Sequence, residues 1–335
     1  MNKVSSICFG RFVIDLPEGS QIRELGQQSE FMFGPIESER TEIDAKGFSE
    51  RMSQRESEIK TKKLKHIYQL TKTISPSSDT QIFLASRDAF GSLGYGFDAH
   101  RLDKNVLFSM TQTGFDPENI DSVVSSLQHD LLPHLRARQQ DEIPSDPGFC
   151  IKDGFVANDG KDSPFEEARV QINLKEWPDL WVSVYSQTVS KAGDKTLIQR
   201  VDNNPLPAEL ASIAGKMRTL RKGKHSVGSL AGEEVLDVLP TEEGFKIHDF
   251  TWEALGAVHD SFKPTLHLEF SSGNGQGGGS HVQPTLTDDQ AIKLFDSIVN
   301  SIRLRPTGPA KVSSAEPTPS SPQAPLGAAI SAGKQ

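Results

Sequence analysis

The residues that could support catalysis in this chain do not form a complete catalytic motif. The segment from Phe90 to Gly94 (FGSLG) is similar to the Gly-x-Ser-x-Gly nucleophile elbow of serine hydrolases, with Ser92 at the nucleophile position. Phe90 replaces the first glycine, and no strand–turn–helix pattern surrounds the segment. We therefore predict a turn between two strands and assign no catalytic residue. A hydrolase that uses an unrecognised Ser/His/Asp site stays open as an alternative.

A second glycine-rich segment, from Gly273 to Gly278 (GNGQGG), fits the Gly-x-Gly-x-x-Gly pattern of dinucleotide-binding loops. In such loops a helix begins at the last glycine, so that its N-terminus receives the pyrophosphate. Here the residues from Ser280 to Pro284 separate the glycines from the next helical pattern. The pattern favours a flexible loop, and we predict no cofactor.

The nine histidines do not indicate a metal site. A proline lies between two of them at a predicted helix end, and three others lie on or beside predicted strands at spacings that fit no common zinc signature. These five residues are His129, His134, His248, His259 and His267. We predict that they are solvated or packed in the core, and that the chain binds no metal.

The two cysteines, Cys8 and Cys150, lie at matching places near the starts of the two halves of the chain. Their separation excludes a zinc-finger pattern. They are either two buried thiols or the two ends of a disulfide. A disulfide would persist only in an oxidising compartment.

A tryptophan pair is the most suggestive candidate for partner binding. The segment EWPDLW carries two indoles four residues apart around a proline, with acidic residues beside them. One tryptophan is expected to pack in the core, while the exposed turn leaves the other free to anchor a partner. The predicted partner-binding residues are Glu176, Trp177, Asp179 and Trp181.

The elements that must position these residues occur twice along the chain. In each half an alternating strand pattern leads through a polar or glycine-rich turn to a helix with a regularly spaced apolar face. The two strand patterns are Val106–Met110 and Leu266–Phe270, and the helices follow Asp116 and Thr287. The repeat predicts an α+β protein with two similar lobes, each an antiparallel sheet with helices packed on one face.

Proline, acidic residues and low complexity set the expected boundaries. We predict an N-terminal domain over 7–138, a linker over 139–147, a C-terminal domain over 148–305 and a disordered Pro/Ser/Ala-rich tail over 306–335. Two helices are expected over 47–63 and 207–220. The predicted strands between the helices cover 66–73, 81–86, 94–100, 233–239 and 244–252.

Composition limits the classes of partner. The formal charge of -9 argues against nucleic acid, whose phosphates require a basic surface. The sequence contains no run of 18 apolar residues, so no segment is expected to span a membrane. The first 19 residues show no continuous apolar segment of a secretory signal. The protein is therefore either cytoplasmic, or its signal lies outside the given start.

Several segments together resemble a known family. They are GRFVIDLP (10–17), RTLRKGKH (218–225), GSLAGEEV (228–235), FTWEALG (250–256) and KPTLHLEF (263–270). Their order and spacing resemble the immunity proteins against type VI secretion lipase effectors, fourth family, over both halves of the chain. The motif residues look structural, since Gly228 and Gly232 suit turns and Trp252 suits the core.

The resemblance implies a two-lobed protein that clamps a cognate secreted phospholipase and blocks it, without being an enzyme itself. It also implies the periplasm, where such effectors arrive. The alternatives are a periplasmic lipid- or ligand-binding protein, which needs an apolar pocket between the lobes, and the hydrolase considered above.

Overall fold

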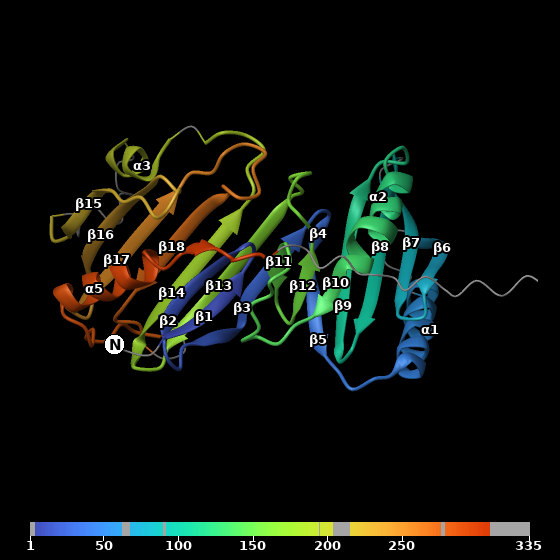
Figure 1. The fold of residues 1–335 in the computed structure, drawn as a ribbon, viewed down its shortest axis with the longest axis horizontal. Helices are drawn as coiled ribbons and strands as arrows, with labels where there is room; N and C mark the ends of the chain where they lie inside the picture. The colour runs from blue at the N-terminus through green and yellow to red at the C-terminus, as the bar shows by residue number, and fades with distance from the viewer. Residues whose placement is uncertain are drawn as a thin grey trace, which may run out of the picture.

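A computed structural model of the chain shows two antiparallel sheets of different size, joined by two small three-stranded sheets (Figure 1). The structure describes residues 4–61, 68–89, 92–193, 195–203, 215–275 and 279–308. The predicted tail from residue 309 onward lies outside the described residues. So do the first two residues of the FGSLG segment, while Ser92 begins a strand.

The smaller sheet is built from the first half of the chain, in the order β5-β9-β8-β7-β6. Helices α1 (Ala45–Thr61) and α2 (Ile120–Ser126) lie on opposite faces of it: Met52 of α1 packs with Phe83, whereas Val124 of α2 belongs to the main core with Leu84. Neighbouring residues of one strand point to opposite faces, which accounts for the two separate clusters. The strands are β5 (Glu37–Arg40), β6 (Tyr68–Ser77), β7 (Thr80–Ala89), β8 (Ser92–Asp103) and β9 (Val106–Phe115).

The larger sheet has eight strands in the order β15-β16-β17-β18-β14-β13-β3-β4. Helix α5 (Asp288–Val299) packs on one face, where Phe295 contacts the rings of Phe250 and Phe270 at centroid distances of 5.6 and 6.1 Å. Thr287 and Gln290 form a capping box that fixes the start of α5. The strands are β3 (Gln21–Phe31), β4 (Gly34–Pro35), β13 (Glu166–Leu174), β14 (Trp177–Gln187), β15 (Arg218–Lys224), β16 (Gly232–Pro240), β17 (Lys246–Ala254) and β18 (Thr265–Ser271).

The strand order confirms the α+β class and the repeat. The expected packing of the helices on one face is wrong for the smaller sheet, because α1 and α2 cover opposite faces of it. The order β5-β9-β8-β7-β6 in the first half corresponds to β14-β18-β17-β16-β15 in the second half. Each half also opens with a hairpin, β1–β2 in the first and β11–β12 in the second. The four hairpin strands are β1 (Val4–Phe9), β2 (Phe12–Pro17), β11 (Gly148–Ile151) and β12 (Gly154–Ala157).

The two halves exchange their closing strands. Strand β10 (Leu135–Ala137), which ends the first half, pairs with β12 of the second half, and β19 (Arg303–Leu304) pairs back with β2 of the first. Strand β3 joins β13 in the larger sheet. Because three strands cross between the halves, the division at the expected linker stays a prediction.

A disulfide also joins the two halves of the chain. Cys8 of β1 and Cys150 of β11 are bonded, with their Cα atoms 6.0 Å apart, and both are buried. Next to them the Gly10 amide donates to the Cys150 carbonyl at 3.0 Å, and the Cys150 amide donates to the Gly10 carbonyl at 2.8 Å. Gly10 has a φ of +52°, a backbone conformation that glycine adopts without steric cost.

One secondary-structure prediction is wrong at its end. We predicted a helix over 207–220, but Arg218–Lys224 is the edge strand β15. Its pairing with β16 contributes tertiary hydrogen bonds that outweigh the helical spacing of the local sequence. Residues 207–214 of that prediction lie outside the described residues.

Candidate partner-binding site

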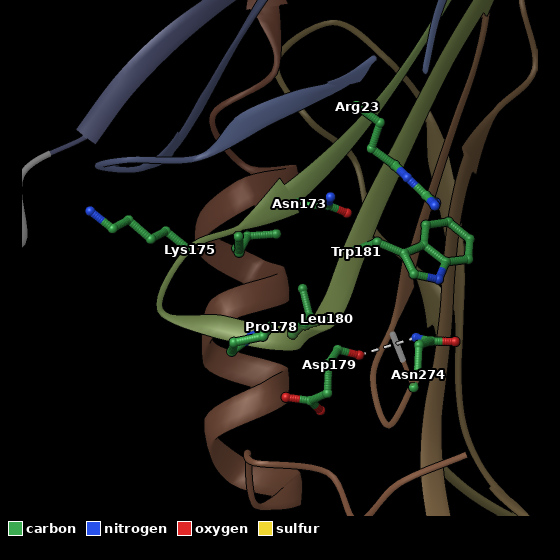
Figure 2. A pocket seen from close by; sticks show the side chains of 10 residues that line it. Arg23, Asn173, Lys175, Pro178, Asp179, Leu180, Trp181 and Asn274 are labelled. Atoms are coloured by element: carbon green, nitrogen blue, oxygen red, sulfur yellow. Dashed lines mark hydrogen bonds between the residues drawn. The ribbon is translucent and has the colours of Figure 1, made fainter. Parts of the chain in front are cut away.

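Three of the four predicted partner-binding residues belong to strand β14, and Glu176 is exposed in the turn that precedes it. Trp181 is half-buried and lines a cavity of about 400 Å³ beside the turn between β13 and β14 of the larger sheet (Figure 2). It points away from the core because Leu180 and Val182, its neighbours in the strand, are fully buried. The residues around the cavity are Arg23, Asn173, Leu174, Lys175, Pro178, Asp179, Leu180, Trp181, Asn274 and Gly275.

Trp177 and Trp181 have different environments. Trp177 packs against the main hydrophobic core, as expected for one of the two indoles. Trp181 faces the cavity, and the Arg23 side chain of β3 extends toward its ring (Figure 2). Arg23 had no local sequence signal, because it reaches the cavity only through the long-range pairing of β3 with β13.

Asp179 is buried and its contacts are internal. Its carboxylate accepts hydrogen bonds from the Gly273 amide at 2.9 Å and from the Thr285 hydroxyl at 2.6 Å, and its carbonyl accepts from the Asn274 amide at 2.9 Å. It therefore holds the two ends of the glycine-rich loop in place rather than facing the surface.

The structure also contains a serine–histidine–aspartate arrangement that sequence reasoning did not identify. His248 Nδ1 lies 2.7 Å from Ser272 Oγ, and His248 Nε2 lies 3.1 Å from Asp288 Oδ1. His248 lies on β17, Ser272 follows β18 and Asp288 begins α5. Because these residues are separated by 24 and then 16 positions, no short motif reveals them.

The surroundings of this group make it structural. Ser272 is 0% and His248 2% exposed, so a substrate carbonyl has no access to the hydroxyl. The two amides that follow Ser272, those of Gly273 and Asn274, already donate to Asp179 and are not free to stabilise an oxyanion. The group links β17 and β18 to the N-terminus of α5.

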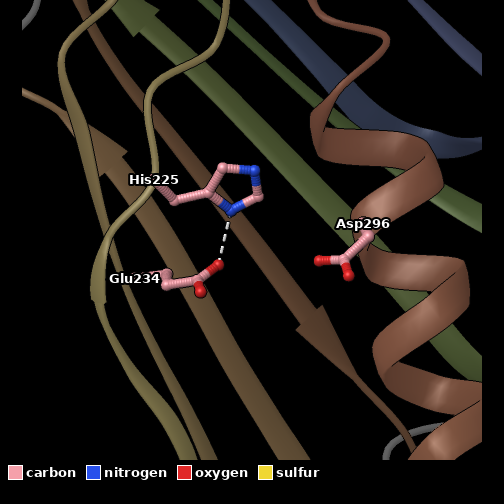
Figure 3. A group of neighbouring side chains, drawn as sticks. All are labelled: His225, Glu234 and Asp296. Carbon is pink, nitrogen blue, oxygen red and sulfur yellow. Dashed lines mark hydrogen bonds and ion pairs between the residues drawn. The ribbon is translucent and has the colours of Figure 1, made fainter.

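His225, Glu234 and Asp296 form a cluster whose residue types suit a metal ion (Figure 3). His225 Nδ1 lies 2.5 Å from Glu234 Oε2. The guanidinium of Arg221 binds both carboxylates of the cluster, contacting Glu234 and Asp296. Because the Arg221 guanidinium already binds both carboxylates, the cluster is an ion-pair network that joins β15 and β16 to α5.

Two family models match the chain in succession. The model of the Tle cognate immunity protein 4 N-terminal domain matches residues 5–143, and that of the C-terminal domain matches residues 142–307. The chain belongs to this family. It carries both domains of the family, in the order the sequence resemblance predicted.

Solved structures show the same architecture. The Tle4–Tli4 complex contains a chain with 29% identity and a TM-score of 0.76, and the match covers 91% of this chain and 98% of that one. The apo immunity protein TplEi of the type VI secretion system from Pseudomonas aeruginosa has 28% identity and a TM-score of 0.75, with the same coverage. TplEi with the "L" peptide has 29% identity and a TM-score of 0.71, covering 91% and 99%. A comparison with curated proteins found no match.

Among the described residues of this family member, no helix combines the length and the apolar character needed to cross a lipid bilayer. The longest of the helices named above, α1, has 17 residues and carries charged side chains along its exposed side.

Proposed function

We propose that this chain binds and inhibits a cognate type VI secretion phospholipase effector by clamping it between its two lobes. The observation that carries the proposal is the match of both family domains, together with the likeness to the immunity chain of the Tle4–Tli4 complex. The exchanged strands and the disulfide fasten the two lobes together. A clamp of this kind is preorganised, so little conformational entropy is lost when it binds.

We infer that the protein acts in the periplasm, as predicted from the family resemblance. The buried disulfide between Cys8 and Cys150 supports this location, because disulfides form and persist in oxidising compartments such as the periplasm and are rare in the cytosol.

We infer further that inhibition involves no chemistry by this chain. The serine of the Ser272–His248–Asp288 group is fully buried, and the amides beside it are occupied. Blocking an enzyme requires only that the bound partner cover the entrance to its active site. An interface of standard size, about 1,600 Å² in total, is sufficient for this.

The direct test is a titration of the cognate Tle-type lipase with this chain. Lipase activity should fall linearly and reach its minimum at one equivalent of the purified protein, and the protein alone should hydrolyse no ester. Ester hydrolysis by the chain alone that disappears in Ser272→Ala would contradict a purely binding role.

Trp181 is proposed as the anchor of the interface, and Trp177 provides its matched control. Trp181→Ala should weaken binding of the lipase by about 2 kcal/mol, roughly 30-fold in Kd, while leaving the melting temperature nearly unchanged. Trp177→Ala should lower the melting temperature, because Trp177 packs on the core. Calorimetric titration and thermal unfolding of both variants separate the two roles. Equal affinity of Trp181→Ala and the unchanged protein would remove Trp181 from the interface.

A further inference from the structure

The larger sheet has a second face, opposite to α5, which we call the outer face. Along β14 the buried Val182 and Val184 alternate with Trp181 and Tyr185, which are both half-buried and point to the outer face. Short helix α3 (Leu197–Asn203) lies over this face only at the start of β16 and the end of β17, where Arg200 donates to Glu253 at 2.8 Å, while Asp249 farther along β17 is exposed. The part formed by β3, β13, β14 and β18 carries half-exposed and exposed polar side chains.

Strand register brings acidic residues together across this face. Glu30 of β3 lies directly opposite Glu167 of β13, and Asp249 of β17 lies opposite Asp237 of β16. In β18, the next strand beside β17, Glu269 lies on the same side of the sheet. Like charges placed opposite one another in a sheet are destabilising, so this pattern does not arise from the needs of the fold.

Four of these five carboxylates make no ion pair with a described residue. Glu167 and Asp237 still accept side-chain hydrogen bonds, whereas the carboxylates of Glu30 and Asp249 accept none from the described residues. The fifth, Glu269, pairs with His267 at 3.1 Å. Partial desolvation, together with repulsion from Glu167, raises the pKa of Glu30. Partial desolvation and the charges of Glu269 and Asp237 likewise raise the pKa of Asp249.

A buried carboxylate oxygen on the same face also lacks a donor. The Glu253 side chain is 9% exposed; its Oε2 binds Arg200, but its Oε1 has no hydrogen-bond partner in the part of the chain that the structure describes. Aromatic rings lie between the acidic groups, and the guanidinium of Arg169 lies 5.1 Å from the ring centroid of Tyr185. That contact shows that a ring on this face accepts a cation.

We propose that the outer face is a docking surface for a lysine- and arginine-bearing segment of the effector, which its carboxylates attract and its rings Trp181 and Tyr185 receive. The inference rests on the proposed function and adds the chemistry of the partner. The supporting argument is charge complementarity: Glu30 and Asp249 lie opposite like charges without an ion pair among the described residues, and a cationic segment of the partner would neutralise them. The cavity beside Trp181 lies at one end of the same surface.

The test uses charge reversal at the two carboxylates that the fold does not need. Glu30→Lys/Asp249→Lys is compared with Glu42→Lys/Glu118→Lys, which changes the net charge equally at exposed sites in the first half of the chain. The probe is the cognate Tle-type lipase with its nucleophile removed. At low ionic strength the outer-face variant should associate about tenfold more slowly than the control variant, and the difference should shrink at high salt.

The outcomes separate the two proposals. If the unchanged protein does not bind this lipase, the proposed function fails. If it binds, and the outer-face and control variants associate and dissociate at equal rates, only the outer-face inference fails.

A neutral variant, Glu30→Gln/Asp249→Asn, shows whether slower association comes from lost charge or from misfolding. Relief of repulsion should raise its melting temperature by about 1 to 3 °C while its association with the lipase slows. An unchanged or lower melting temperature would contradict the repulsion on which the inference depends.

Discussion

Replacing both cysteines with alanine (Cys8→Ala/Cys150→Ala) should lower the free energy of unfolding by up to about 5 kcal/mol. The disulfide spans 142 positions of the chain, and the chain entropy that a cross-link removes from the unfolded state grows with the length of the closed loop. Because a folded domain is stable by only about 5 to 15 kcal/mol, this loss is large. It should also free β1 and β11 from each other.

Urea unfolding of three samples measures this effect. The three samples are the oxidised protein, the reduced protein and the double alanine variant. Reduction removes only the cross-link and keeps both side chains in the core, whereas the variant also removes the two sulfur atoms. The reduced protein should unfold at a clearly lower urea concentration than the oxidised one. Identical midpoints, or two free thiols in protein recovered from the periplasm, would contradict the structural role of the disulfide.

Arg11→Met should destabilise the protein by about 3 to 5 kcal/mol, because it leaves the Glu166 carboxylate buried without its partner. Both side chains are 4% exposed, and Arg11 Nε donates to Glu166 Oε2 at 2.8 Å. Burial raises the pKa of Glu166, and the neighbouring guanidinium opposes that shift. Arg11 also donates to the carbonyl and the side chain of Asn158, so it ties the first hairpin to the second half.

A double-mutant cycle isolates this pair. Arg11→Met/Glu166→Leu should recover much of the loss, since removing both charges costs far less than removing one. The exposed pair Arg51–Glu39 is the matched control, and Arg51→Met should cost no more than about 1 kcal/mol. A loss for Arg11→Met as small as that of Arg51→Met would show that the buried pair does not hold the halves together.

Local patterns account for the parts of the fold that the sequence predicted. Alternation in Leu266–Phe270 and the apolar spacing after Thr287 are properties of neighbouring residues, and they predict a strand and a helix without any tertiary information. The repeat followed from the same patterns, since each occurs twice. The α+β class could therefore be predicted from local patterns, whereas the family followed from the resemblance of the quoted segments.

Long-range pairing accounts for what the sequence did not show. The pairing of β3 with β13 and that of β19 with β2 join residues more than 100 positions apart, for which a single sequence carries no signal. Asp179 was taken as a surface residue because a turn with proline and acids is usually exposed. Its burial depends on the glycine-rich loop folding over it, about 94 positions later in the chain.

Hydrogen exchange in the complex with the lipase tests the clamp most directly. Free and bound protein should differ in both lobes, with slowed amide exchange in strands of the five-stranded sheet and in strands of the eight-stranded sheet, including β14 around Trp181. Because the lobes are fastened by exchanged strands and a disulfide, we expect no opening between them on binding. Slowed exchange confined to one lobe, with complete inhibition of the lipase, would contradict the clamp.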